Sequence, residues 1–405
     1  MATCVFCGNG VGKSIRTKEH ILPMWLLETT GDPHRKIRIE YDPDTSAEII
    51  RPASTFHFPA CGDCNSFYGR TLEGQAKSAF ETLSSTGSLR VSQCYQLLDW
   101  FDKVRIGLWL GFHALHKEVF VPKFRIDARL GKKDRVAVVS VDPDDRFKGL
   151  HFGGCDNNVF RTSQAGLYVR INNVRILTFS FDSLISKFAG APYCKEMFVV
   201  EHTDQHAGVM SPGTESLSQD WKEFGSIGAT VLAQPVFCPA SVGIEHVADT
   251  FFNPHMAGHL RKKPKLTRFE DLQRFFQMQL ISNSDGVFRF HRNANERVNV
   301  AKAPHNDDRS FMLSLYRALL RHVLPLSPIE VIDEQGKKHG NILLTLLTVE
   351  KLLQIVLRLE SLGASDAKLK DELIDEVHKL TRLREESQAH IHGTCLPESG
   401  ILLRS

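Results

Sequence analysis

The sequence predicts an α+β protein, and three observations carry this prediction. Two C-x-x-C pairs lie within the first 65 residues, alternating apolar runs fill the middle of the chain, and helical periodicity follows from about residue 246. A chain of 405 residues is longer than one hydrophobic core usually carries. We therefore expect a small cysteine-stabilised domain at 1–85, a helical connector and strand-rich domain at 86–245, and a mainly helical region at 246–405.

The elements of the first domain follow from its breakers and its apolar spacing. Residues 17–20 should end a strand, because Pro23 turns the chain out of it. A polar, turn-rich stretch follows, with a short strand expected at 36–40. Residues 65–82 contain few breakers and place Leu72, Ala76 and Phe80 on one side, which predicts a helix that begins at the second cysteine pair.

The rest of the chain changes period twice. Residues 93–117 are rich in Trp, Leu and Phe at helical spacing and predict one or two helices. Strands are expected at 135–141, 167–171, 174–181 and 197–200, with a tight turn at Asn172-Asn173 between two of them. The stretch 203–220 is rich in Gly, Ser, Thr and Pro and predicts a long loop. Further helices are expected near 268–281, 308–323, 341–361 and 365–388.

Composition and charge limit the possible functions but do not identify one. The formal net charge of +3 is mildly basic, so it neither requires nor excludes nucleic acid as a partner. The longest apolar run, 342–359, contains Glu350, Lys351 and Arg358, which predicts a buried amphipathic helix and no membrane span. No secretory leader pattern is evident, and the nine cysteines are an odd number. These features favour a reducing, cytoplasmic setting.

Four cysteines predict a structural zinc site. Cys4-x-x-Cys7 and Cys61-x-x-Cys64 supply four thiolates, which is the ligand set of a tetrahedral structural zinc. The long separation of the two pairs is tolerated, because the entropy of loop closure grows slowly with loop length. Zinc alone implies no chemistry, so a non-catalytic module that binds nucleic acid or protein is the alternative to an enzyme.

Three further residues add the groups that phosphodiester hydrolysis needs. Glu19-His20 lies between the cysteine pairs, and Asn65 directly follows the last cysteine. A histidine can serve as a general base near neutral pH, while carboxylate and amide oxygens suit Mg²⁺ or Mn²⁺. Adjacent residues of a strand face opposite sides. Glu19 and His20 therefore serve one metal centre only if the strand ends or twists there.

These residues together resemble the HNH nuclease superfamily, also called the ββα-metal or His-Me finger fold. The resemblance lies in Cys4-Val-Phe-Cys7, Glu19-His20-Ile21-Leu22-Pro23 and Cys61-Gly-Asp-Cys64-Asn65, and it covers about residues 1–85. It implies a Mg²⁺- or Mn²⁺-dependent endonuclease that acts on DNA, with RNA not excluded. It also implies a setting in phage defence or in a mobile element.

The resemblance implies a role for each matched residue. His20 would be the general base, Glu19 and Asn65 would hold the catalytic metal, and the four cysteines would hold zinc. In the following helix, Arg70 could contact phosphate and Glu73 could add a contact near the metal. The sequence departs from the superfamily in two places: Glu19 stands where Asp is commoner, and the stretch 54–60 lacks the Asn that braces the histidine loop. His57 is the residue there that could take the bracing role, or it is an exposed loop residue.

A basic segment in the C-terminal part adds a second candidate for DNA contact. Arg261, Lys262, Lys263 and Lys265 lie close together, with further arginines up to residue 297. Phosphate contacts from such residues supply non-specific affinity for nucleic acid. A solvated, mildly basic surface explains the same residues equally well. A partner protein or a second copy of the chain is left open by the sequence.

Overall fold

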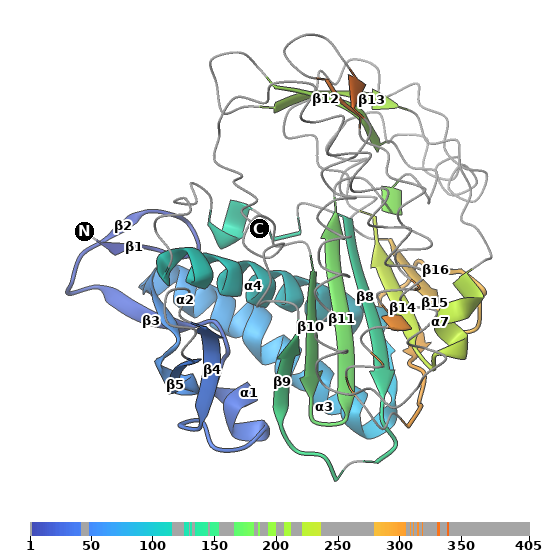
Figure 1. The fold of residues 1–405 in the computed structure, drawn as a ribbon, viewed down its shortest axis with the longest axis horizontal. Helices are drawn as coiled ribbons and strands as arrows, with labels where there is room; N and C mark the ends of the chain where they lie inside the picture. The colour runs from blue at the N-terminus through green and yellow to red at the C-terminus, as the bar shows by residue number, and fades with distance from the viewer. Residues whose placement is uncertain are drawn as a thin grey trace.

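One long helix, α4 (Val91–Leu115), joins an N-terminal module that contains four clustered cysteines to a seven-stranded antiparallel sheet (Figure 1). The protein is therefore α+β. The computed structural model describes residues 2–41, 48–115, 125–128, 130–131, 134–144, 146–153, 166–181, 185–186, 193–199, 206–211, 221–235, 279–304, 308, 311, 314–315, 318, 330–332 and 338–339.

Short strand pairs build the N-terminal module. Three antiparallel pairs form, β1 with β2, β3 with β6, and β4 with β5. The strands span β1 (Ala2–Thr3), β2 (Gly10–Val11), β3 (Arg16–His20), β4 (Lys36–Tyr41), β5 (Glu48–Pro52) and β6 (His57–Cys61). Pro23 caps the short helix α1 (Met24–Thr29) that follows β3, which confirms the predicted strand end. β4 confirms the strand expected at 36–40.

The helix predicted at 65–82 is longer than expected. α2 (Gly62–Tyr68) begins directly after Cys61, a π-helical turn covers Gly69–Glu73, and α3 (Gly74–Thr86) continues the run. The run ends at Gly87, whose φ of 68° is the left-handed conformation that glycine adopts readily at a helix C-terminus. A single π turn inside a helix adds a residue to that turn, and such turns are frequent at functional sites.

α4 confirms the helix predicted at 93–117, and it is buried on most of its circumference. Its apolar residues pack in two directions, toward the cysteine module through Ile106, Trp109 and Leu110 and toward the sheet through residues such as Leu97 and Phe101. The helix also carries charged side chains that are buried, namely Asp102, Lys103 and Arg105. Buried charges are tolerated only when they are paired, so each of these residues needs a partner.

The large sheet has the strand order β16-β15-β14-β8-β11-β10-β9. Its strands are β8 (Asp134–Val141), β9 (Leu150–Gly153), β10 (Gly166–Ile171), β11 (Val174–Phe181), β14 (Thr230–Gln234), β15 (Leu280–Asn283) and β16 (Arg289–His291). Every residue of β8 and β10 is buried, so the centre of the sheet is covered on both faces. The predicted turn is confirmed: Asn172, at a φ of 52°, and Asn173 join β10 to β11.

Three expectations about the later part of the chain need correction. The loop expected at 203–220 contains a strand, β13 (His206–Ser211), because pairing with β12 (Tyr193–Val199) outweighs its turn-rich composition. Within the range 268–281, where a helix is expected, the described residues Leu280 and Ile281 belong to strand β15. Residues 279–304 also form β16 and β17 (Arg297–Asn299), so this part of the region expected to be helical is made of strands. Short apolar runs do not distinguish helix from strand by periodicity.

The hydrophobic core does not divide at the expected domain boundaries. β14 pairs with β15 across residue 245, and β17 pairs with β7 (Ser88–Arg90), which precedes α4. One cluster of buried side chains runs from Leu22 to Val300. β12 and β13 form a separate sheet with β18 (Glu330–Ile332) and β19 (Lys338–His339). The described residues between 308 and 318 are helical, as expected, and the helices expected at 341–361 and 365–388 lie outside the described residues.

Candidate metal centre and the adjoining histidine face

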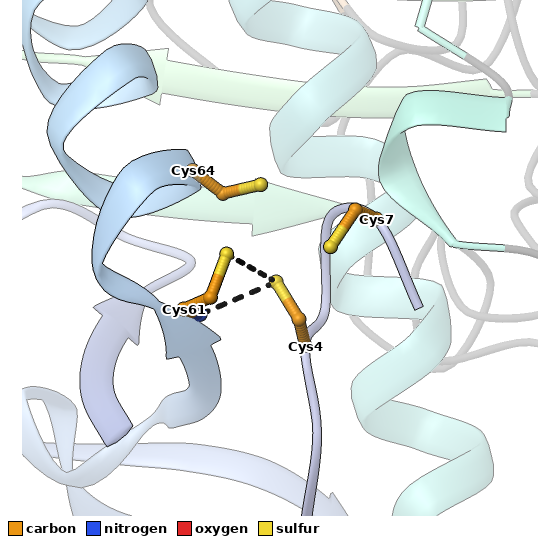
Figure 2. Close-up of side chains that lie close together, drawn as sticks. All are labelled: Cys4, Cys7, Cys61 and Cys64. Carbon is orange, nitrogen blue, oxygen red and sulfur yellow. Dashed lines mark hydrogen bonds between the residues drawn. The ribbon is translucent and has the colours of Figure 1, made fainter. Parts of the chain in front are cut away.

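The four cysteines of the two C-x-x-C pairs come together in space. Their Sγ atoms all lie within 4.8 Å of one another, and Figure 2 shows the side chains pointing toward a common centre. The Sγ atoms of Cys4 and Cys61 are 3.8 Å apart. Zinc–sulfur bonds of about 2.3 Å in a tetrahedron require sulfur–sulfur distances of about 3.8 Å. The cluster therefore fits a metal such as zinc, and among the described residues it is the one such group of cysteine, histidine or acidic side chains.

Backbone hydrogen bonds place the two cysteine pairs. The first pair lies in a tight turn in which Gly8 N–H donates to the Cys4 carbonyl, with Gly8 at a φ of 80°. Val5 N–H donates to the Pro59 carbonyl, which ties this turn to β6. Cys61 ends β6 and Cys64 lies in the first turn of α2. The strand–helix junction and the N-terminal turn thus bring together residues 57 positions apart.

The environment of Cys4 favours its thiolate form. Its Sγ accepts a hydrogen bond from the Cys61 backbone N–H at 3.4 Å. Burial opposes ionisation, but backbone N–H groups of Cys61, Cys7 and Phe6 outweigh it and lower the pKa of Cys4 below its ordinary value. A thiolate is the form that binds metal. Burial raises the pKa of Cys64, so a bound metal ion would be what keeps that thiol ionised.

His20 and His57 face each other across the β3–β6 pair. They are register partners, and their rings meet edge to face with centroids 5.6 Å apart. His57 is exposed and His20 is partly buried. The Nδ1 atom of His20 is buried and has no hydrogen-bond partner among the described residues. Burial, followed by the charges of His57, Lys103 and Lys18, lowers the pKa of His20, so its imidazole is neutral at pH 7.

Basic side chains continue the face on which His20 lies. Along β3, Thr17 and Glu19 point to the inner side, where the Thr17 hydroxyl donates to the Ala60 carbonyl and Glu19 is buried. Because side chains alternate along a strand, Arg16 and Lys18 share the opposite side with His20. Both are exposed. We call Arg16, Lys18, His20 and His57 the histidine face.

The Glu19 carboxylate forms a buried ion pair with Lys103. Its Oε1 atom lies 2.7 Å from Nζ of Lys103, a residue of α4 that is fully buried. The same Nζ lies 2.6 Å from Oε1 of Glu73. Burial raises the pKa of Glu19, although Lys103 opposes this shift. Glu19 and His20 therefore point to opposite sides of β3 and are not brought together.

The other predicted site residues lie on α2, in the π turn or outside the described residues. Asn65 lies in the first half of α2, partly exposed, and α2 packs against both β3 and β6. Arg70 is exposed in the π turn. The basic residues Arg261, Lys262, Lys263 and Lys265 lie outside the described residues.

Sequence reasoning missed Lys103 and the acceptors around it. The signal was present, because Lys103 is one of a few charged residues, with Asp102 and Arg105 beside it, in a helix whose side chains are mostly apolar. Such a residue must have a buried partner. Local sequence does not identify Glu19 and Glu73 as these partners, since they are 84 and 30 residues away.

A Ser–His–Glu chain of hydrogen bonds lies elsewhere, in the sheet. Ser282 Oγ is 2.6 Å from His291 Nε2, and His291 Nδ1 is 2.9 Å from Glu296 Oε2. Ser282 is only 5% exposed on a strand paired on both sides, so a substrate has no access to its hydroxyl. Glu296 also accepts the backbone N–H groups of Arg292 and Asn293. This chain stabilises the turn between β16 and β17.

In comparisons with known proteins, no family model, curated protein or solved structure matches the chain. Within the part of the chain that the structure describes, every helix is too short or too polar to span a bilayer.

Proposed function

We propose that this protein is an HNH-type endonuclease that hydrolyses phosphodiester bonds in DNA at the histidine face. The observation that carries the proposal is the partly buried His20 imidazole on a face lined by the exposed side chains of Arg16 and Lys18, and the lowered pKa of His20 favours its neutral form. A neutral imidazole is the form that accepts a proton from water. Its lowered pKa keeps it available as a base at pH 7.

Basic residues beside His20 support an anionic polymer as the substrate. Arg16 and Lys18 share the face of β3 with His20 and offer ammonium and guanidinium groups to phosphate oxygens. In this proposal they hold the backbone of the nucleic acid while His20 deprotonates the attacking water. The exposed His57 imidazole, opposite His20, can donate a further hydrogen bond to the phosphate.

The arrangement of elements around this face supports the same reading. The antiparallel pair β3–β6 is followed directly by α2, which packs against both strands, and the cysteine cluster lies where β6 meets α2. This order of strand, strand and helix is the order that the resemblance to the HNH superfamily implies. Zinc at the cysteines would fix the junction and supply no chemistry.

The proposed Mg²⁺ or Mn²⁺ ion has one suitable ligand in this arrangement and lacks the other. The amide oxygen of Asn65 on α2 suits such an ion. Glu19 does not fit the role, because its carboxylate is buried and paired with Lys103 on the inner side of β3. The proposed chemistry therefore depends first on His20, and dependence on a divalent ion is a separate property of the site. A role in phage defence or in a mobile element rests on the resemblance alone.

The experiment is incubation of the zinc-loaded protein with supercoiled plasmid, linear DNA and RNA, each with and without Mg²⁺ or Mn²⁺. We expect nicking of plasmid that is lost in His20→Ala, while zinc content and thermal unfolding stay as in the wild type. Cleavage of RNA in place of DNA would change the substrate but keep the site. Binding of nucleic acid without any cleavage would instead support the alternative, a non-catalytic zinc module.

A further inference from the structure

One face of α4 lies directly against the residues that neighbour the two histidines. Lys103, Gly107 and Gly111 are spaced four apart and so form one line along the helix. A Cβ atom on Gly107 would lie 2.5 Å from Cδ1 of Ile21, and one on Gly111 would lie 2.4 Å from Cζ of Phe56. The helix backbone therefore approaches the residue after His20 and the residue before His57 too closely for any larger side chain.

Lys103 binds this end of β3 through the backbone. Its Nζ donates to the carbonyl of His20 at 2.9 Å and lies 3.3 Å from the carbonyl of Ile21. The ammonium has three N–H donors and four acceptors, counting Glu19 and Glu73, so two of the acceptors share one donor. Hydrogen bonds that involve a charged group are stronger than neutral ones, so the backbone at His20 is firmly held.

Glu73 is held in turn by two tryptophans. Its Oε2 atom accepts hydrogen bonds from Nε1 of Trp25 and of Trp100, each at 3.0 Å, while Oε1 binds Lys103. Glu73 is the last residue of the π turn between α2 and α3. The contact thus links the helix run that begins at the cysteine cluster to α4 and to the end of β3.

We propose that Lys103 is a positioning residue for His20, with Glu19 and Glu73 as its counter-charges, and that Glu19 is therefore not a ligand of a catalytic divalent cation. The positioning role rests on the proposed function of His20. A cation bound at the Glu19 carboxylate would lie beside the Lys103 ammonium, whose Nζ is 2.7 Å from Glu19 Oε1, and would be repelled by it. The buried carboxylate instead keeps the lysine charged and directed at the His20 carbonyl.

The first experiment perturbs the position of His20 and observes it directly. The imidazole Cε1–Hε1 signal of His20, assigned with His20→Ala, is recorded by NMR in the full-length zinc-loaded protein. We expect the signal to move in Lys103→Met and to stay in place in Lys77→Met, which removes an exposed lysine of α3. An unchanged signal in folded Lys103→Met would overturn the proposal.

A glycine variant tests the same face without changing any charge. Gly107→Ala forces Ile21 to shift, whereas Gly74→Ala, at the start of α3, meets its nearest neighbour at an ordinary 3.7 Å. We expect kcat for plasmid nicking to fall on the order of 10²-fold in Gly107→Ala with KM within about twofold, and no loss in Gly74→Ala. This variant also serves if Lys103→Met fails to fold. Equal kcat in the two glycine variants, with the His20 signal unmoved, would contradict positioning by α4.

The second part of the proposal is tested by binding of Mn²⁺ alone. Zinc-loaded wild type and Glu19→Gln are titrated with Mn²⁺, and the free ion is measured by electron paramagnetic resonance. Equal affinity, or no binding by either protein, is the expected result. A weakening of tenfold or more in Glu19→Gln would make Glu19 a metal ligand and overturn this part.

These measurements separate the inference from the proposed function. The NMR and Mn²⁺ experiments need no activity, so they decide whether α4 sets the position of His20 and whether Glu19 binds a metal in either case. If the plasmid assay shows no cleavage, the proposed function fails while the structural part of the inference stands or falls by itself.

Discussion

Two buried charge clusters, one beside the cysteine module and one in the sheet, differ in what they touch. Around Lys103, one cation lies between two carboxylates, and its remaining contacts go to the backbone of β3 beside His20. In the sheet, Arg170 and Arg175 pair with Asp142 and Asp308, so the charges balance within the cluster. The sheet cluster ties strands to the helical residue 308.

Burial of charge is therefore not by itself a sign of function. Both clusters contain fully buried cations, Lys103 and Arg175. Only the Lys103 cluster contacts a strand whose opposite side carries an exposed face of histidine and basic residues. We therefore assign a positioning role to the first cluster and a purely structural role to the second.

The largest effect should come from the metal centre. Cys61→Ala removes one of four converging thiolates, and loss of a structural metal is among the few changes that cost more than about 4 kcal/mol. We expect the variant to lose about one equivalent of zinc by elemental analysis and to lose the cooperative unfolding of the module. Cys94→Ala is the matched control, because Cys94 is buried in the apolar core away from this cluster. Retention of zinc in Cys61→Ala would refute the site.

Breaking either charge cluster should cost a similar amount of stability. Lys103→Met leaves the carboxylates of Glu19 and Glu73 without their shared cation, and Arg175→Met leaves Asp142 and Asp308 to share Arg170. Removing one partner of a buried ion pair in this way costs about 3–5 kcal/mol in the free energy of unfolding. Urea unfolding monitored by circular dichroism measures both. The two variants should differ in the position of His20, which moves only in Lys103→Met. An equal response of the His20 NMR signal to both variants would remove the distinction between the clusters.

The pH dependence of stability should have opposite signs in the two clusters. Burial alone would raise the pKa of Asp308, but hydrogen bonds from His151, Arg175 and Arg170 hold it well below its ordinary value of 3.8. Its contribution is therefore present above that value and is lost as the pH falls through the folded-state pKa. Burial raises the pKa of Glu19 above its ordinary 4.5, so its contribution is present below that value and is lost as the pH rises.

Two variants check this difference in urea titrations. We expect Asp308→Asn to reduce the loss of stability below about pH 4. Wild type should gain stability relative to Glu19→Gln as the pH falls from 7 toward 4.5. A gain in the opposite direction for Glu19→Gln would mean that the ion pair with Lys103, and not burial, dominates at Glu19.

The smallest effect concerns the exposed part of the histidine face. Arg16→Ala and Lys18→Ala should each weaken binding of a DNA duplex and reduce the slope of log affinity against log salt by about 1. Fluorescence anisotropy with His20→Ala as the background measures binding without cleavage. Lys77→Ala is the control for a general change in charge. An unchanged salt slope in both variants would place the DNA contact elsewhere.

Much of the module could be predicted from the sequence, because local chemistry determines it. The cysteine pairs, the strand end before Pro23 and the helix after Cys61 each depend on residues close in the chain. Asn172-Asn173 likewise specifies its own turn. The strand β13 could not be predicted in this way, since its stability comes from pairing with β12 and its own composition favours a loop.

The site residues, too, differ in whether local sequence or distant contacts determine their positions. The cysteines are identified by their spacing, and the cluster of their four sulfurs is confirmed. His20 is a candidate through the sequence resemblance, and its role stays a prediction. The position of Glu19 depends on Lys103, which is distant in sequence and reaches β3 only because Gly107 lets α4 approach Ile21. Side chains alternate along a strand, so Glu19 and His20 were expected to point to opposite sides of β3 unless the strand twisted. The buried Lys103 explains why Glu19 points to the inner side.

The central claim is that His20 activates water at this face. The most direct measurement is the single-turnover rate of plasmid nicking by His20→Ala relative to wild type, with zinc content and DNA affinity matched. Loss of a general base reduces such rates by about 10²–10⁴-fold, and we predict a fall in this range. A rate equal to that of the wild type would contradict the account.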